Sequence, residues 1–368
     1  MTCTVRFERF AVALSDPLTT ASATITRREG FLVRIETETR CGIGEATPLD
    51  GWTESIEDCR AALERIEDGW TFETCPSSHA VDAAFGDVLR SAPAARHGLT
   101  LACLDLRAKR ARQPLYRYLG GREHIDSVPV NATIGDGTVA ETVTAAENAV
   151  DRGYSCLKCK VGARSVTEDV SRLRAVRSAV GPTVELRGDA NGAWSRKQAT
   201  TALEAFEDAG VSYVEQPLAS TDIEGHAILR TETDIGVALD ETVRTTSITR
   251  VLAARAADVL VIKPMVLGGV DRAHATARLA RAVRADVTPV VTTTIDAAYA
   301  RAGAIHVGAA IPNVAACGLA TGELLDTDLA CGPSVTRGQI AVPQTAGVGV
   351  RGETATGNSV GRSKATDA

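Results

Sequence analysis

The stretch Cys156-Leu157-Lys158-Cys159-Lys160-Val161 is short and largely apolar, and it carries two of the six lysines in the chain. A run of this kind predicts a buried β-strand. Because side chains two residues apart in a strand share a face, Lys158 and Lys160 would point the same way. Arginine outnumbers lysine 34 to 6. Because lysine is scarce in this chain, two lysines on one face of one strand indicate a functional role.

Seven further runs of the same type recur at roughly even spacing, and stretches with helical periodicity lie between them. The runs are 128–134, 184–190, 211–216, 236–241, 259–263, 289–294 and 313–319. The clearest helical stretches are 165–180, 195–209, 247–257 and 271–285. Eight strands alternating with helices predict an α/β fold, a (β/α) barrel of the TIM type in modified form. A doubly wound open sheet is the alternative, but it would often carry a glycine-rich phosphate loop after its first strand, and none is present.

The residues before the barrel predict a separate α+β domain over 1–125. Its strand candidates are 31–38 and 41–46, and its helix candidates are 53–68 and 99–119, the second ending at Gly120-Gly121. The barrel would span 126–320, and a segment over 321–350 would pack back on the N-terminal domain. The polar, small-residue tail 351–368 is expected to be disordered.

Composition narrows the class of partner. The chain has 368 residues, 44% of them hydrophobic, and a net charge of −6. An acidic protein of this kind is not expected to bind nucleic acid. The sequence shows neither a signal peptide nor a long apolar span, so we expect a cytoplasmic protein without membrane contact. The nine scattered cysteines predict reduced, buried thiols, and Cys156 and Cys159 would face opposite sides of their strand.

Charged residues stand at the carboxyl ends of the strands that follow the two lysines. Asp189, Glu215 and Asp240 end three successive strands, and Lys263 ends the next one. Three carboxylates converging on a barrel mouth would repel one another unless a cation joined them, and hard oxygen ligands suit Mg²⁺. Each residue alone has an ordinary explanation as a helix cap or a solvated group, and a Lys-x-Lys strand could be a protected edge. Their order on five consecutive strand ends favours an active site.

The lysines suggest the chemistry. Two buried ammonium groups side by side would lower each other's pKa, and burial would lower both. A lysine of this kind can act as a base near neutral pH. We therefore predict a small-molecule carboxylate substrate whose α-proton a lysine removes while the metal holds the resulting charge.

This pattern resembles the enolase superfamily, in its muconate-lactonising subgroup. The motifs that carry the resemblance are Lys158-Cys-Lys160, Asp189-Ala-Asn191-Gly-Ala-Trp194, Glu215-Gln216-Pro217, Asp240-Glu241, Ile262-Lys263-Pro264, Gly42-Ile-Gly44-Glu45-Ala46 and the helix over 102–121. The resemblance covers residues from about 5 to 345 and implies that the N-terminal domain is a cap over the barrel mouth. Its loop around 18–28 would close over the substrate.

Roles follow from the resemblance residue by residue. The Mg²⁺ ligands would be Asp189, Glu215 and Asp240, with Mn²⁺ as a substitute metal. The catalytic pair would be Lys160 and Lys263, with Lys158 adjusting Lys160. Asn191 and Glu241 would support the site from behind these residues.

Within the subgroup the chain is most similar to the o-succinylbenzoate synthases of menaquinone biosynthesis. The final strand end, Cys317-Gly318-Leu319-Ala320-Thr321, resembles their Gly-Leu-x-Thr, and Arg187 also matches. The substrate-binding residues would then be Arg187, Thr293 and Gly318. The seventh strand end, Thr292-Thr293-Thr294-Ile295-Asp296, departs from the Ser-Ser-x-Glu-Ser of many members. The implied reaction is a Mg²⁺-dependent dehydration of 2-succinyl-6-hydroxy-2,4-cyclohexadiene-1-carboxylate, a hydro-lyase reaction through a metal-stabilised enediolate.

Two other functions remain open at this point. An N-acylamino acid racemase or dipeptide epimerase would use the same two lysines. The epimerases usually carry Asp-x-Asp at the last strand to hold the substrate amine, and here Asp326-Thr-Asp328 falls several residues beyond that strand. A barrel that only binds its ligand is the third possibility. Assembly into a homo-oligomer is common for such barrels.

Overall fold

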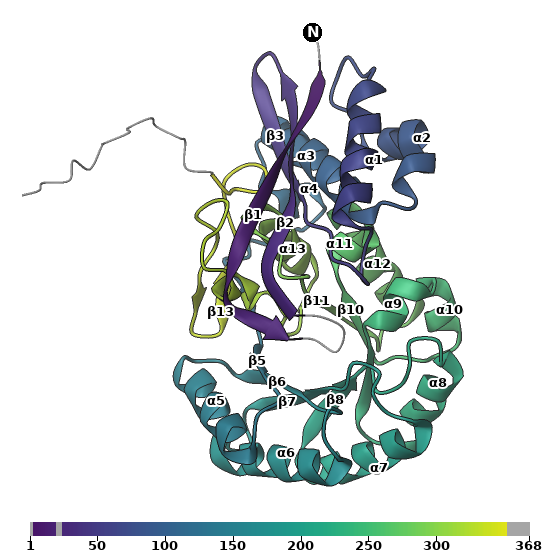
Figure 1. Cartoon of the computed structure of the whole chain (residues 1–368), viewed down its shortest axis with the longest axis vertical. Coiled ribbons are helices and arrows are strands. Elements are labelled where there is room, and N and C mark those ends of the chain that lie inside the picture. The colour runs from purple at the N-terminus through teal and green to yellow at the C-terminus, as the bar shows by residue number, and fades with distance from the viewer. Residues whose placement is uncertain (1–2, 20–23, 352–368) are drawn as a thin grey trace, which may run out of the picture.

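The structure, a computed structural model, describes residues 3–19 and 24–351 (Figure 1). Residues 352–368 of the expected disordered tail, and part of the loop expected to close over the substrate, lie outside the described residues. Figure 1 shows an N-terminal antiparallel sheet with its own helices above a curled parallel sheet that helices cover on the outside.

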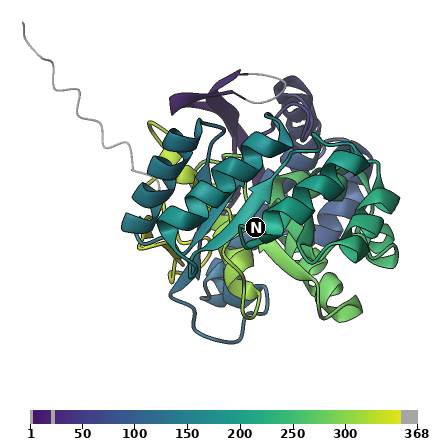
Figure 2. The same cartoon turned by 90° about the horizontal axis from the view of Figure 1, so that it is seen from below.

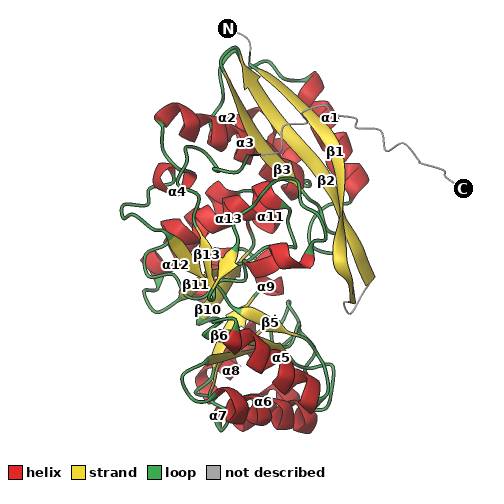
Figure 3. Cartoon of the chain, turned by 90° about the vertical axis from the view of Figure 1, so that its left-hand side faces the viewer, coloured by secondary structure: helices red, strands yellow, loops and turns green. Residues whose placement is uncertain are grey.

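The N-terminal sheet has the strand order β1-β2-β3. Its strands are β1 (Thr4–Thr19), β2 (Thr24–Thr37) and β3 (Arg40–Ala46). Three helices pack on one face of this sheet, as Figure 3 shows. They are α1 (Ile56–Asp68), α2 (Ser78–Leu89) and α3 (Pro93–Ala111), and the short helix α4 (Leu115–Tyr118) follows them with its buried residues in the core of the barrel.

Parts of this domain differ from what the sequence predicted. Strand β1 and helix α2 were not predicted. The single helix expected over 99–119 is wrong, because α3 ends at Ala111 and α4 begins after Pro114. Arg112, directly after α3, has a left-handed φ of 56°. Proline cannot continue a helix because it lacks an N–H.

Glycines allow β3 to lie directly on α3. A Cβ at Gly44 would stand 1.9 Å from the carbonyl oxygen of Gly98, and one at Gly42 would stand 2.1 Å from that of Ala102. No larger residue fits at either place, which explains the Gly-x-Gly spacing before Glu45.

The parallel sheet has seven strands in the order β11-β10-β9-β8-β7-β6-β5. They are β5 (Ala132–Ile134), β6 (Cys156–Lys160), β7 (Glu185–Asp189), β8 (Val211–Glu215), β9 (Gly236–Leu239), β10 (Val259–Ile262) and β11 (Thr288–Val291). Each is followed by helix, and Figure 2 shows several of these helices side by side on the outer face. The arrangement confirms the predicted barrel class.

The helices of the barrel begin at residues that the sequence marks as caps. Thr138, Ser165 and Ser195 each form a capping box with the glutamate or glutamine three residues later. The helices are α5 (Val139–Asp151), α6 (Val166–Val180), α7 (Arg196–Glu207), α8 (Ile223–Glu232), α9 (Glu241–Thr245), α10 (Ile248–Ala253), α11 (Pro264–Leu267), α12 (Val270–Val283) and α13 (Ala298–Ala310).

The two ends of the predicted barrel pattern differ from expectation. The eighth strand, expected over 313–319, is reduced to Cys317 and Gly318, which bridge to Val130 on one side and Thr292 on the other. These bridges still join the two edges of the parallel sheet. Two residues are enough to join the edges, because the backbone N–H of Cys317 donates to Pro129 O and its carbonyl accepts from Asn131 N.

The first expected strand, 128–134, is divided between two sheets. Strand β4 (Ser127–Pro129) belongs to a small antiparallel sheet with β12 (Val335–Thr336) and β13 (Gln339–Ala341), and only β5 joins the barrel. A 3₁₀ helix, η1 (Ala320–Leu324), precedes this sheet. Residues near the described C-terminus contact the cap, since Val348 N donates to Asp105 Oδ1 at 2.8 Å.

Candidate active site

Strand register brings the predicted residues together at one end of the barrel. Lys160 of β6 pairs with Asp189 of β7, and Asp189 pairs with Glu215 of β8. Asp240 directly follows β9, and Lys263 directly follows β10. Side chains at the carboxyl ends of neighbouring parallel strands meet at one edge, so the order read from the sequence becomes an arc of charge.

The two lysines of β6 contact the first two carboxylates. Lys158 Nζ lies 2.8 Å from Asp189 Oδ2 and 3.0 Å from Glu215 Oε2. Lys160 Nζ lies 2.7 Å from the same Asp189 oxygen. The carboxylate side chains are 1% and 4% exposed, whereas the Lys160 side chain is 35% exposed. Lys160 is thus the lysine of this pair that a ligand at the mouth can reach.

Lys263 stands on the far side of the arc, after β10, and three strands separate β10 from β6 in the sheet. Its ammonium pairs with Asp240 and lies 3.5 Å from the ring centroid of Trp52. Trp52 belongs to the cap, in a turn where its N–H donates to Leu49 O at 2.9 Å. The cap therefore supplies an aromatic face to a lysine of the barrel, a cation–π contact.

Burial and pairing set the protonation of these groups. Burial raises the pKa of Glu215 to about 7, and repulsion from Asp189 adds to the effect. Burial also raises the pKa of Asp240, against the opposing effect of Lys263. For Asp189 burial is outweighed by Lys158 and Lys160, which hold its pKa well below the ordinary value.

The expectation that the lysines depress each other's pKa is wrong for Lys158 in this arrangement. Burial does lower its pKa, but Asp189 and Glu215 outweigh burial and raise the pKa well above the ordinary value. Carboxylates within hydrogen-bond distance favour the ammonium form more strongly than a second lysine disfavours it. Lys158 is therefore a fixed positive charge between two carboxylates.

Asn191 and Glu241, predicted to support the site, are joined to Lys160 by hydrogen bonds, and the Asn191 side chain is exposed. Lys160 Nζ donates to Asn191 Oδ1 at 2.7 Å, and Asn191 Nδ2 donates to Glu241 Oε1 at 3.1 Å. The other carboxylate oxygen of Glu241 is buried and has no hydrogen-bond partner among the described residues. A chain of contacts thus connects Lys160 with the residue next to Asp240.

Gln216 is a supporting residue to which the sequence reasoning gave no role. Its fully buried side chain accepts hydrogen bonds from the backbone N–H groups of Asp240 and Thr242, each at 3.1 Å. Its φ of 43° is left-handed, which is strained for glutamine. The sequence feature that could have identified it is a long polar side chain between the predicted ligand Glu215 and Pro217, at the end of a buried strand.

The residues predicted to bind substrate occupy different positions. Arg187 lies deeper in the barrel, where it bonds Glu185 Oε1 at 2.8 Å and Ala316 O at 2.6 Å. Thr293 meets Thr321 hydroxyl to hydroxyl at 2.7 Å. Gly318 bridges to Thr292 at the closing edge. Arg187 is the register partner of Lys158. Within the described residues no hydrogen bond or ion pair joins Arg187, Thr293 or Gly318 to the lysine side chains, and their contact with substrate stays a prediction.

The donor set fits a hard divalent cation, although the carboxylates are paired with lysines. Within residues 3–19 and 24–351, no three carboxylate, imidazole or thiol groups converge as a ready metal site. The Lys158 ammonium lies between Asp189 and Glu215, where the charges call for a cation. Three buried carboxylates and the unpartnered oxygen of Glu241 are oxygen donors that suit Mg²⁺.

Two other predictions concern the whole chain. All nine cysteines are free thiols, as expected, and seven of them are buried. In the described part of the chain, no helix combines the length and the apolar composition needed to cross a membrane.

Comparison with known proteins gives two family matches. Residues 141–355 match a family described as "Enolase C-terminal domain-like", and residues 3–103 match one described as "MenC, N-terminal domain". The first covers more than half of the chain.

Similar proteins include enzymes of different reaction types. The chain is 30% identical over 355 residues to the L-Ala-D/L-Glu epimerase of Bacillus subtilis, covering 95% of this chain and 96% of that one. It is 37% identical over 212 residues to the o-succinylbenzoate synthase of Thermobifida fusca, covering 56% and 64%.

Solved structures agree on the fold. The dipeptide epimerase of Enterococcus faecalis complexed with Mg and L-Leu-L-Tyr has a TM-score of 0.86 at 26% identity, covering 95% of this chain and 99% of that one. A substrate-liganded complex of the B. subtilis epimerase has a TM-score of 0.88 at 29% identity, covering 96% and 99%. Together with the arc of lysines and carboxylates, these matches show that the chain belongs to the enolase superfamily.

Proposed function

We propose that this protein is a Mg²⁺-dependent o-succinylbenzoate synthase, a hydro-lyase. The observation that carries the chemistry is the arc of three buried carboxylates between Lys158–Lys160 on β6 and Lys263 after β10. A site that removes an α-proton needs a base, a means of holding negative charge and a second cationic group.

Asp189, Glu215 and Asp240 would hold the metal, and bound Mg²⁺ would supply positive charge opposite the substrate carboxylate. Lys160, the more exposed lysine of β6, would remove the proton next to that carboxylate. Its ammonium form would then assist departure of the β-hydroxyl as water, and aromatisation of the ring favours this step. Lys263 would remain cationic and stabilise the developing negative charge.

The choice of substrate rests on the cap match and on the closing edge of the barrel. Residues 3–103 match the N-terminal domain of a MenC family, and the synthase of T. fusca is among the relatives. Asp328, part of the Asp-x-Asp sequence, accepts from Ala298 N at 2.8 Å and pairs with Arg301 at 2.6 Å. It is therefore already engaged by the start of α13, which argues against a role in holding a substrate amine.

A dipeptide epimerase is the second candidate, because epimerases are among the most similar proteins over nearly the full chain. Both reactions would use Lys160 and Lys263, but the epimerase would need a proton transfer at each face of Cα.

The decisive experiment is a direct ultraviolet assay for o-succinylbenzoate formation with Mg²⁺, run beside L-Ala-L-Glu and other dipeptides in D₂O. We expect dehydration of the cyclohexadiene carboxylate and only slow deuterium incorporation into the dipeptides. Fast deuterium incorporation at Cα without dehydration would replace the synthase by the epimerase. No reaction with either class, together with no response to Mg²⁺, would favour a barrel that only binds its ligand.

A further inference from the structure

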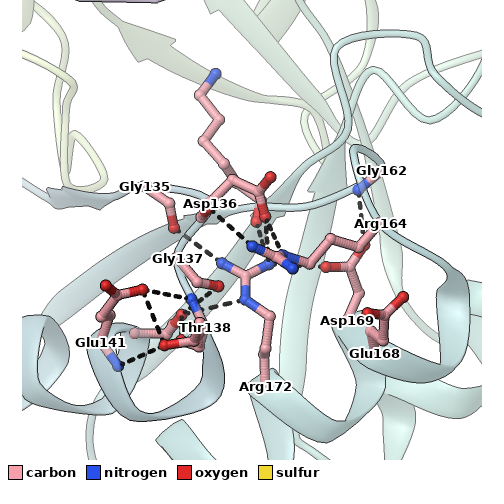
Figure 4. Close-up of polar contacts among 12 residues, drawn as sticks. Gly135, Asp136, Gly137, Thr138, Glu141, Gly162, Arg164, Glu168, Asp169 and Arg172 are labelled. Carbon is pink, nitrogen blue, oxygen red and sulfur yellow. Dashed lines mark hydrogen bonds and ion pairs between the residues drawn. The ribbon is translucent and has the colours of Figure 1, made fainter.

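A buried arginine beside Lys160 has no part in the chemistry proposed above. Arg172 lies on α6, and its side chain is 1% exposed. Its guanidinium donates to the backbone carbonyl of Lys160 at 2.9 Å and to that of Gly135, which follows β5, at 2.8 Å. Figure 4 shows Arg172 between the segment Gly135–Thr138 and Asp169. One side chain therefore ties together the ends of β5 and β6.

Asp169 completes this arrangement from the preceding turn of the same helix. Its Oδ1 pairs with Arg172 at 2.7 Å, and its Oδ2 accepts from the backbone N–H of Gly162 at 2.7 Å. Asp169 itself is fully buried. The pair thus holds the carbonyl of Lys160 on one side and the amide of Gly162, two residues later, on the other. Figure 4 shows Gly162 beside Asp169.

The remaining backbone contacts around Lys160 point the same way. Val161 N donates to Asp189 O at 2.9 Å, so the peptide after Lys160 is tied to the neighbouring strand. Gly162 has a φ of 91°, and a Cβ there would stand 2.9 Å from that of Ala193. The chain can turn away from the strand only through this glycine.

A buried ion pair is a costly way to obtain stability alone, because desolvation offsets most of its attraction. In this protein the charged side chains of Arg172 and Asp169 hold backbone groups in place. Arg172 reaches four further groups besides Asp169: the carbonyls of Gly135 and Lys160, Thr142 Oγ1 at 3.1 Å, and Asp136 Oδ1 at 3.3 Å. All of them lie near the ends of β5 and β6 or on α5.

We propose that Arg172 and Asp169 are positioning residues for Lys160. They act through the backbone, by fixing the direction in which the end of β6 projects the Lys160 side chain, and neither touches the substrate. This inference rests on the proposed role of Lys160 as the base. A base displaced by about 1 Å can lose about 10²-fold in rate, so a rigid strand end has a direct catalytic value.

The chain offers a matched control on the same helix. Arg177 of α6 also donates to backbone carbonyls, those of Gly181 and Val184 at 2.7 Å, Ala209 at 2.9 Å and Gly210 at 3.0 Å. These carbonyls precede β7 and β8, at the opposite end of the strands from Lys160. Arg177→Met should therefore lower stability without moving the base.

The test compares Arg172→Met with Arg177→Met, together with Arg172→Lys and the double variant Asp169→Asn/Arg172→Met. The double variant leaves no unpaired buried carboxylate and keeps an oxygen for Gly162, so it covers the case in which Arg172→Met does not fold. Each variant is assayed for kcat and KM, for Tm, and for hydrogen–deuterium exchange of the backbone amides in 160–165.

We expect Arg172→Met to lower kcat by about 10- to 100-fold, with KM within about 3-fold, and to speed amide exchange in 160–165. Arg172→Lys should recover part of kcat, because a lysine can still reach one carbonyl. Arg177→Met should lower Tm by as much while leaving kcat within about 2-fold of the wild type.

Equal loss of kcat in Arg177→Met and Arg172→Met at equal loss of Tm would overturn the proposal, as would unchanged exchange in 160–165. The exchange measurement needs no substrate, so it tests this inference even if the wild type converts neither proposed substrate. Failure of the proposed function would instead appear as a wild type that does not dehydrate the cyclohexadiene carboxylate, and failure of the proposed role of Lys160 as retained activity in Lys160→Ala.

Discussion

Two clusters of buried charge in this protein differ in what neutralises them. Between cap and barrel, Glu45 of β3 accepts from the backbone N–H groups of Ala297, Tyr299 and Ala300 at 2.8, 3.1 and 2.9 Å, at the start of α13. At the barrel mouth, the carboxylates form ion pairs with lysine ammonium groups; they are Asp189, Glu215 and Asp240.

The difference separates a structural site from a reactive one. Backbone amides at a helix start are fixed dipoles that cannot leave, so Glu45 is held permanently. Lysine side chains are flexible and can change partners when a metal or substrate enters. A side-chain ion pair also joins cap and barrel, between the buried Arg96 of α3 and Asp271 of α12 at 3.0 Å.

The largest effect is expected from Lys160→Ala. Loss of the base should lower kcat by about 10²–10⁴-fold, because general base catalysis contributes about that factor. The measurement is the rate of o-succinylbenzoate formation, with circular dichroism and a Mg²⁺ titration as controls for fold and metal binding. Activity close to that of the wild type would remove Lys160 from the mechanism and weaken the contrast between the two clusters.

Glu45→Ala should act on stability instead. It leaves three backbone N–H groups at the start of α13 without their acceptor, which should cost about 3 kcal/mol of unfolding free energy. Urea unfolding measures this loss. The control is Glu64→Ala on α1, whose exposed side chain pairs with Arg60 and which should change the free energy by less than about 0.5 kcal/mol. Equal effects of the two substitutions would contradict the structural role of Glu45.

The pH dependence of stability distinguishes the clusters more finely. Burial, with repulsion from Asp296, raises the pKa of Glu45 from 4.5 to about 7, and Glu215 is raised to about 7 as well. Between pH 4.5 and about 7, each of these glutamates keeps a proton in the folded protein that it has lost in the unfolded chain. Each glutamate therefore contributes stability that is complete below pH 4.5 and is lost as pH rises through about 7, on the order of 3 kcal/mol.

Mg²⁺ should remove the shares of Glu215 and Asp240, whose pKa values burial raises, because a cation beside these carboxylates favours their charged forms. We expect the fall in unfolding free energy between pH 5 and 8 to become shallower with saturating Mg²⁺. Glu45→Gln should lower the slope that remains further, and the buried Glu54 and Asp105, whose pKa values burial also raises, should account for part of what is left. A slope that Mg²⁺ leaves unchanged would argue against Glu215 as a ligand.

The smallest effect is expected at Trp52, which connects cap and mouth through Lys263. A partly buried cation–π contact contributes about 0.5–2 kcal/mol, so Trp52→Ala should lower kcat/KM by about 3- to 30-fold. Trp52→Phe keeps an aromatic face and should recover most of the activity. If phenylalanine and alanine gave the same loss, the contact with Lys263 would not be the reason for it.

The regular half of the barrel could be predicted from the sequence. From β6 to β10 each strand is a short apolar run with a charged residue at its end, and the helices α6, α7 and α8 each begin at a side-chain cap. In parallel strands this one-dimensional order translates directly into spatial neighbours. Lys160, Asp189 and Glu215 therefore meet as predicted, with Asp240 and Lys263 completing the arc.

The tertiary structure decided whatever depends on contacts between distant segments. The eighth strand is two residues long because neighbouring backbone, not its own pattern, closes the sheet. Trp52 reaches Lys263, and Arg172 fixes the end of β6, through packing that leaves no periodic signal. The pKa of Lys158 is raised because carboxylates from two other strands lie within hydrogen-bond distance. The sequence by itself determined which charges line the mouth, and the folded chain alone determined which groups surround each charge, because burial and distance exist only after folding.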